Sequence, residues 1–145
     1  MDNNIPPKEI AEEEMIDQAF QQLLHDYLAT KHRKRVEIIT KAFNFANQAH
    51  KGIKRRSGEP YIMHPIAVAQ IVCNEIGLGS TSICAALLHD VVEDTGHTLD
   101  DICKLFGQNI AQLVDGVTKL VQMKQMVLNK EEQQMESVRK MLFAM

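Results

Sequence analysis

Apolar residues recur at helical spacing from about Glu12 to the end of this chain, and runs typical of β-strands are almost absent. Two apolar stripes, each on one face of an expected helix, are Phe20, Leu23, Leu24, Tyr27 and Leu28, and Val36, Ile39, Ala42, Phe43 and Ala46. With 145 residues, 45% of them hydrophobic, the chain fits one domain with a packed core. We therefore expect an all-α helical bundle over residues 12–145, after an irregular or disordered segment at residues 1–11.

Glycine, proline and capping residues indicate where the helices begin and end. Pro65 suits the first position of a third helix, because its missing amide hydrogen would have no intrahelical acceptor there. Ser80 or Thr81 can cap a fourth helix, which carries the His89–Asp90 pair and ends near residues 95–96. The other expected segments are a basic loop over 51–60, a short capped helix from Thr98 to Gly107, and helices over 109–126 and 130–145.

Charge and cysteine use narrow the classes of partner. A net charge of −3 offers no long-range attraction toward nucleic acid or anionic lipid. The three cysteines contain no Cys-x-x-Cys pair and read as reduced thiols. The sequence shows no signal peptide and no run of about 18 apolar residues. These features predict a cytoplasmic protein that binds neither nucleic acid nor membrane.

Four polar residues stand at the end of an otherwise apolar segment, as His89-Asp90 followed by Glu93-Asp94. On a continuous helix, positions four apart face the same way, so His89 would stand over Glu93 and Asp90 over Asp94. An imidazole beside a carboxylate suits manganese, iron or zinc better than calcium or magnesium. Carboxylates at the C-terminal end of a helix oppose its dipole, which indicates a compensating cation or a function.

His64 is the best candidate for a third metal ligand, because 25 residues separate it from His89, enough for one helix out and one back. His50 is a weaker candidate, since it can simply end the second helix. The remaining histidines lie among polar residues and are expected to be solvated: His25, His32 and His97. The basic run at residues 51–56 is either a solvated loop or a contact for a phosphate-bearing ligand.

Three blocks of this sequence together resemble a known family. Residues 55–65, 85–95 and 113–120 are similar, in this order, to the N-terminal hydrolase domain of the RelA/SpoT alarmone enzymes, within the wider HD-domain phosphohydrolases. The resemblance covers roughly residues 32 to 145. It implies an all-helical, Mn²⁺-dependent enzyme that removes the 3′-diphosphate from ppGpp or pppGpp, giving GDP or GTP and pyrophosphate, in the stringent response.

The same resemblance assigns roles to individual residues. It implies that the metal is held by His64, His89 and Asp90. It implies that the attacking water is positioned or activated by Glu93 and Asp94. It implies that Arg55 stacks on the guanine base, with Arg56 and Ser57 as neighbouring nucleotide contacts.

The sequence departs from the family at its C-terminal end. The family's fourth metal ligand is an aspartate in a Leu-Ala-Asp-Arg-Leu-His block, downstream of a segment that matches Arg139–Leu142, and this chain stops before it. We therefore expect a truncated HD domain, with an exposed apolar face that favours self-association. The alternatives are a nucleotide-binding or regulatory fragment with weak catalysis, and an HD phosphohydrolase of another nucleotide.

Overall fold

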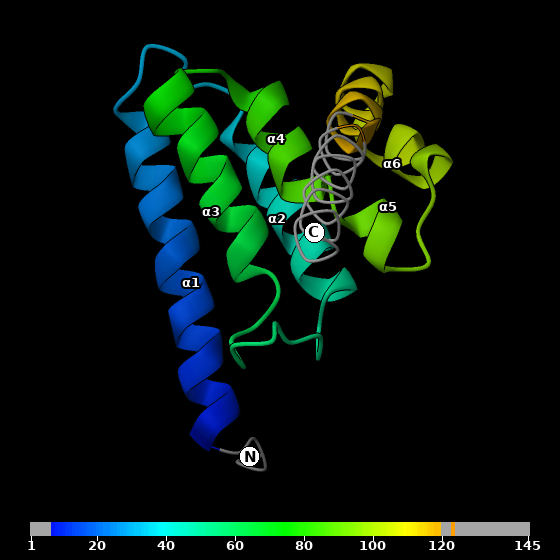
Figure 1. The fold of residues 1–145 in the computed structure, drawn as a ribbon. Helices are drawn as coiled ribbons and strands as arrows, with labels where there is room; N and C mark the ends of the chain where they lie inside the picture. Colours follow the sequence, from blue (N-terminus) through cyan, green and yellow to red (C-terminus); the bar gives the residue numbers. More distant parts are fainter. Residues whose placement is uncertain (1–6, 120–122, 124–145) are drawn as a thin grey trace, which may run out of the picture.

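The computed structural model describes residues 7–119 and 123, and every regular element within them is a helix (Figure 1). The elements are α1 Pro7–Leu28, α2 Val36–Ala49, α3 Met63–Ile71, the π-helical turn η1 Val72–Ile76, α4 Ser80–Leu88, α5 Val91–Asp94 and α6 Leu99–Phe106. Residues 108–119 form a further helix. The all-α prediction is thus confirmed for the described residues, and the expected helix over 130–145 lies outside them.

Helix α1 begins at Pro7, so residues 7–11, which we expected to be irregular, are helical. A proline is tolerated at the first helical position, and the carboxylate of Glu9 in the first turn is favoured by the positive end of the helix dipole. Phe20, Leu23 and Tyr27 are buried as predicted. Leu28 is 50% exposed, because it is the last residue of α1 and the chain turns away there.

Helix α4 passes through the centre of the molecule. It packs against α2 and α3, and α3 also packs against α1, so α4 is covered from several sides (Figure 1). Six consecutive residues of α4, from Ile83 to Leu88, are buried. A helix that is apolar all round is a core helix, which explains why the segment shows no polar face. The C-terminal end of α4 therefore delivers the next residues, His89 and Asp90, directly to the edge of the core.

Several helix ends differ from the prediction. Helix α3 begins at Met63, so Pro65 is its third residue and still lies in the first turn, where no intrahelical acceptor is required. The residue that precedes α4 is Gly79, and no side chain caps this helix, so neither Ser80 nor Thr81 has the expected role. Thr98 does form the expected capping box with α6.

Helix α4 also ends at Leu88, short of the expected end near residues 95–96, and α5 follows as a separate turn. The ring of His89 hydrogen-bonds the carbonyl of Ala86, at 2.6 Å, and so competes with the helical amide for that acceptor. No helix in the described part of the chain is long and apolar enough to span a bilayer.

Candidate metal centre

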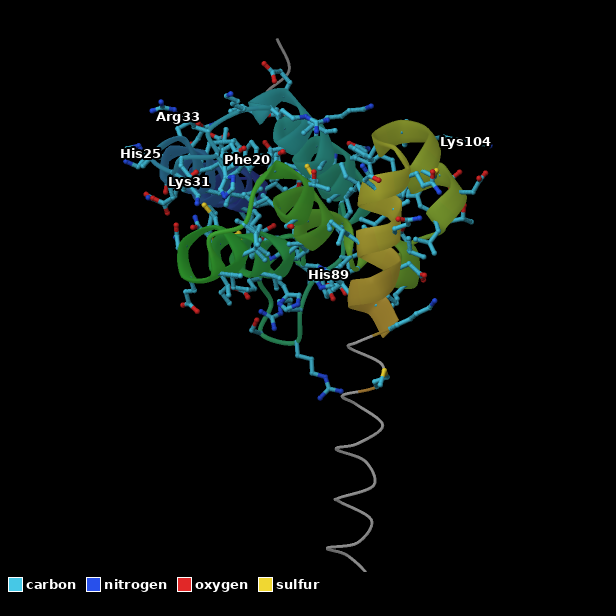
Figure 2. All side chains as sticks on the ribbon, turned by 90° about the horizontal axis from the view of Figure 1, so that it is seen from above. Phe20, His25, Lys31, Arg33, His89 and Lys104 are labelled. Carbon is cyan, nitrogen blue, oxygen red and sulfur yellow. The ribbon has the colours of Figure 1, made fainter. Side chains whose placement is uncertain are left out.

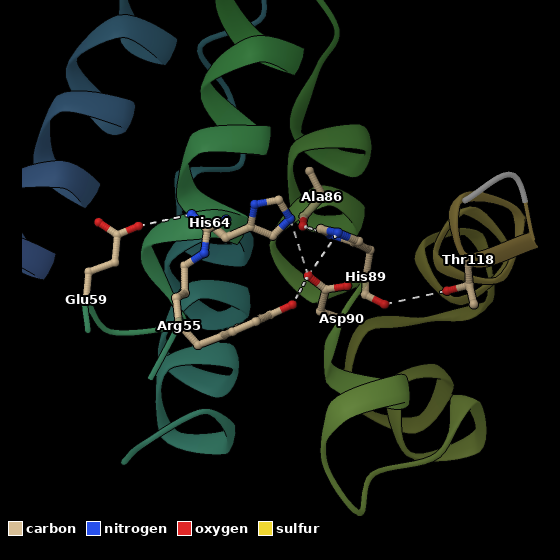
Figure 3. Close-up of polar contacts among 8 residues, drawn as sticks. Arg55, Glu59, His64, Ala86, His89, Asp90 and Thr118 are labelled. Atoms are coloured by element: carbon tan, nitrogen blue, oxygen red, sulfur yellow. Dashed lines mark hydrogen bonds and ion pairs between the residues drawn. The ribbon is translucent and has the colours of Figure 1, made fainter. Parts of the chain in front are cut away.

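Two histidines and an aspartate meet at the C-terminal end of α4 (Figure 3). His64 comes from the first turn of α3, and His89 and Asp90 form the turn between α4 and α5. Nε2 of His89 lies 3.1 Å from Oδ2 of Asp90, and Nε2 of His64 lies 3.7 Å from the same oxygen. One ligand atom from each residue lies within 4.8 Å of the other two, in the single cluster of this kind among the described residues. Two imidazoles and one carboxylate fit a divalent transition metal.

The ring of His89 is fixed by a backbone contact. Its Nδ1 donates to the carbonyl of Ala86, at 2.6 Å, and since a carbonyl only accepts, the proton lies on Nδ1. Nε2 is then directed at Asp90, as in metal sites where a carbonyl orients the ligating histidine. Burial alone would lower the pKa of His89, but its hydrogen bonds with Asp90 and Ala86 raise it above the ordinary value. The ring thus takes up a proton more readily than a free imidazole does.

His64 has the opposite balance. Partial burial lowers the pKa of His64 more than the attraction of Asp90 raises it, and the charges of His89 and Arg55 lower it further. The neutral imidazole is the form that ligates a metal ion. Asp90 itself is buried, which would raise its pKa, but hydrogen bonds from His89 and Tyr61 hold that pKa below the ordinary value. Asp90 is therefore an anion, which is the form in which a carboxylate ligates a metal ion.

Sequence reasoning missed Tyr61. Its hydroxyl donates to Oδ2 of Asp90 at 3.0 Å, and burial together with the charge of Asp90 raises the pKa of Tyr61, so the hydroxyl keeps its proton. The available signal was its position three residues before His64, about one turn away. His50, the weaker metal candidate, is not in the cluster; its ring stacks on Tyr61 with centroids 4.9 Å apart.

Glu93 and Asp94 lie on α5 and are exposed. Because the helix is broken at His89–Asp90, the expected stacking of His89 over Glu93 on one continuous helix is wrong. Both carboxylates nevertheless act on the cluster. Burial lowers the pKa of His89, but the contacts with Asp90 and Ala86 raise it, and the charge of Glu93 raises it further. Burial is the main cause of the raised pKa of Tyr61, and Asp94 adds to it.

The loop that precedes α3 brings Arg55 beside His64 (Figure 3). Nη1 of Arg55 pairs with Oε1 of Glu59 at 3.0 Å, and the backbone amide of Arg55 donates to the carbonyl of Glu59 at 2.9 Å. Arg56 and Ser57 are exposed on the same turn, and in the described part of the chain no hydrogen bond or ion pair joins them to the cluster. The structure thus places Arg55, but not its two neighbours, next to the metal centre.

The three histidines expected to be solvated divide into two groups. His25 is exposed and points away from the helices (Figure 2). The other two are half-buried and so only partly solvated, and neither belongs to the cluster. Nε2 of His32 contacts the carbonyl of Gly77 at 3.0 Å, and His97 packs on Phe45 with ring centroids 4.6 Å apart.

Comparisons with known proteins agree with this geometry. A guanosine-3′,5′-bis(diphosphate) 3′-pyrophosphohydrolase of Escherichia coli O157:H7 is 45% identical over 128 residues, which are 88% of this chain and 17% of the relative. A probable GTP pyrophosphokinase of Mycobacterium leprae is 48% identical over 110 residues, 76% of this chain and 13% of the relative. This chain therefore spans less than a fifth of the length of these curated relatives.

A solved structure is also similar. It is described as a metazoan ortholog of SpoT that hydrolyzes ppGpp and plays a role in starvation responses. It is 36% identical, with a TM-score of 0.53, over 56% of this chain and 47% of that one. The family model named HD domain matches residues 42–145, a range that contains the whole cluster of His64, His89 and Asp90. On this match and this geometry, the chain belongs to the HD domain family.

Proposed function

We propose that this chain is a metal-dependent phosphohydrolase domain that removes the 3′-diphosphate of ppGpp, giving GDP and pyrophosphate. The convergence of His64, His89 and Asp90 within 4.8 Å is the main support. The similar proteins include a ppGpp 3′-pyrophosphohydrolase and an ortholog of SpoT that hydrolyzes ppGpp. The relative named as a GTP pyrophosphokinase matches over only 13% of its length, so most of that protein has no counterpart here.

The cluster fits one divalent ion, and we propose Mn²⁺. Two nitrogen donors of borderline softness and one hard carboxylate suit manganese better than magnesium, which prefers oxygen ligands alone. Held by His64, His89 and Asp90, the ion would supply Lewis-acid charge that polarises a phosphoryl oxygen and acidifies water.

Glu93 and Asp94 are the proposed catalytic pair. Both are exposed carboxylates on α5, beside the cluster, and can take a proton from the attacking water. The water oxygen attacks the phosphorus bound to the 3′-oxygen of the ribose. The bond from that phosphorus to the 3′-oxygen breaks, the 3′-oxygen takes up a proton, and pyrophosphate leaves with the oxygen of water.

Arg55 is the proposed contact for the guanine base of ppGpp or pppGpp. Its guanidinium is planar, lies beside His64, and is held by Glu59 at 3.0 Å. A planar cation can stack on a purine while remaining charged toward a phosphate. Arg56 and Ser57, exposed on the same loop, would meet the nucleotide from that side.

The test is pyrophosphate release from ppGpp by the purified chain with Mn²⁺. We expect Glu93→Gln and Asp94→Asn each to lower kcat by about 10²-fold or more, since each removes a base from the site. Asp100→Asn is the matched control, because this carboxylate is exposed on α6 and paired with Lys104 instead. Nucleotide binding without turnover in the wild type would support a binding or regulatory fragment. Equal turnover of nucleotides with and without a 3′-phosphate would contradict the proposed substrate.

A further inference from the structure

Oδ2 of Asp90 is the point on which the polar contacts of the metal centre converge. This oxygen lies near Nε2 of both His64 and His89, and it also accepts a hydrogen bond from the hydroxyl of Tyr61 at 3.0 Å. A carboxylate oxygen has two lone pairs, so Oδ2 can accept from Tyr61 and still face a cation. The Tyr61 hydroxyl is thus placed to fix the rotation of the carboxylate without occupying its ligating position.

The ring of Tyr61 is held in turn by His50. The two rings are stacked, with centroids 4.9 Å apart and planes inclined by 22°. His50 is only 2% exposed, and its Nδ1 donates to the carbonyl of Ala46 at 3.0 Å. Nε2 of His50 is buried and has no hydrogen-bond partner among the described residues, so the ring's polar contact is the one to Ala46 and its face is left to the stack on Tyr61. A continuous line of contacts therefore runs from α2 through His50 and Tyr61 to Asp90.

We propose that Tyr61 is a positioning residue for the metal centre and that His50 acts through it, by holding the Tyr61 ring where its hydroxyl meets Asp90. This inference rests on the metal binding proposed above. Residues that hydrogen-bond a ligating side chain fix its orientation, and their loss typically lowers metal affinity by about 10- to 100-fold. A ring stack with a merely structural role would leave metal affinity unchanged once the protein is folded.

The experiment measures Co²⁺ affinity of the full chain by its visible absorption, with far-UV circular dichroism to verify folding. We expect Tyr61→Phe, which keeps the ring and removes only the hydroxyl, to weaken binding by about 10-fold or more. His50→Ala should weaken it similarly. His50→Phe should bind Co²⁺ with an affinity close to the wild-type value, because it keeps a flat ring at this position. The backbone amide of residue 50 still donates to the carbonyl of Ala46 in this variant. His97→Ala, which removes a ring packed at a tilt on Phe45 and outside the cluster, is the control.

The double variant decides whether His50 acts through the hydroxyl. If it does, adding His50→Ala to Tyr61→Phe lowers Co²⁺ affinity no further, because the hydrogen bond is already absent. Additive losses in the two variants would overturn the role of His50, and wild-type affinity in Tyr61→Phe would overturn the proposal as a whole. A wild-type chain that binds no Co²⁺ would instead refute the metal centre itself. Should His50→Ala fail to fold, the comparison of Tyr61→Phe with the wild type still decides the role of the hydroxyl.

Discussion

Two adjacent valines on α5 offer a matched test of how the turn after His89–Asp90 is anchored. Val91 is 0% exposed, whereas Val92 is half-buried, so the same substitution removes the same atoms from different surroundings. Replacing Val91 by alanine removes two buried carbon groups, at about 0.8 kcal/mol each, and the cavity that remains adds about 1 kcal/mol. The free energy of unfolding should therefore fall by about 2–3 kcal/mol for Val91→Ala, and by less than about 1 kcal/mol for Val92→Ala.

Urea unfolding followed by circular dichroism measures both losses, and equal m-values would show that the same unfolding transition is compared. The reasoning requires a clear order, with the Val91 variant less stable than the Val92 variant. An equal loss in the two variants, or a larger one for Val92→Ala, would mean that α5 is not anchored through Val91. The exposed placement of Glu93 and Asp94 on α5 would then be wrong as well.

Three further predictions concern the cap, the thiols and the metal. Thr98→Ala should cost about 1 kcal/mol in urea unfolding. The capping bonds with Thr98 hold the pKa of Asp101 below its ordinary value. The stability from this carboxylate is therefore present above about pH 4 and is lost as the pH falls through the folded-state pKa. The free energy of unfolding of Thr98→Ala should accordingly depend less on pH in the acid range. Cys103 is half-buried, whereas Cys84 is buried and its burial raises the pKa of its thiol to about 12. Ellman's reagent should therefore label Cys103 before Cys84, and the reverse order would contradict this. Mn²⁺ at about 100 times its Kd should stabilise the fold by roughly 2.7 kcal/mol, and His64→Ala should abolish the thermal shift that results.

The sequence was sufficient to predict the cluster of His64, His89 and Asp90, because these three residues stand at helix ends, where local signals are strong. A proline follows His64, and a long apolar segment precedes His89 and Asp90. Two helices of ordinary length between these positions return the chain to the same place. The cluster in the structure has the three residues predicted for it.

The contacts that surround these ligands could not be predicted in the same way. The stack of His50 on Tyr61 joins the end of α2 to the loop before α3, and its geometry depends on tertiary packing. The local sequence around His50 is also equally consistent with a residue that only ends the second helix. Periodicity likewise assigns residues to faces only if the helix is continuous, so it could not reveal the break after Leu88.

That break reconciles two requirements that one straight helix cannot meet. Helix α4 is buried from Ile83 to Leu88, whereas Glu93 and Asp94 are exposed, as their proposed role on water and substrate requires. Ending α4 at Leu88 also places His89 and Asp90 at its C-terminal end, where the helix dipole favours a positive charge. The hydrogen bond from the His89 ring to Ala86 then has two effects, since it orients a proposed metal ligand and competes for the carbonyl that would continue the helix. The residue that we propose as a metal ligand therefore also separates the buried helix from the acidic turn beside it.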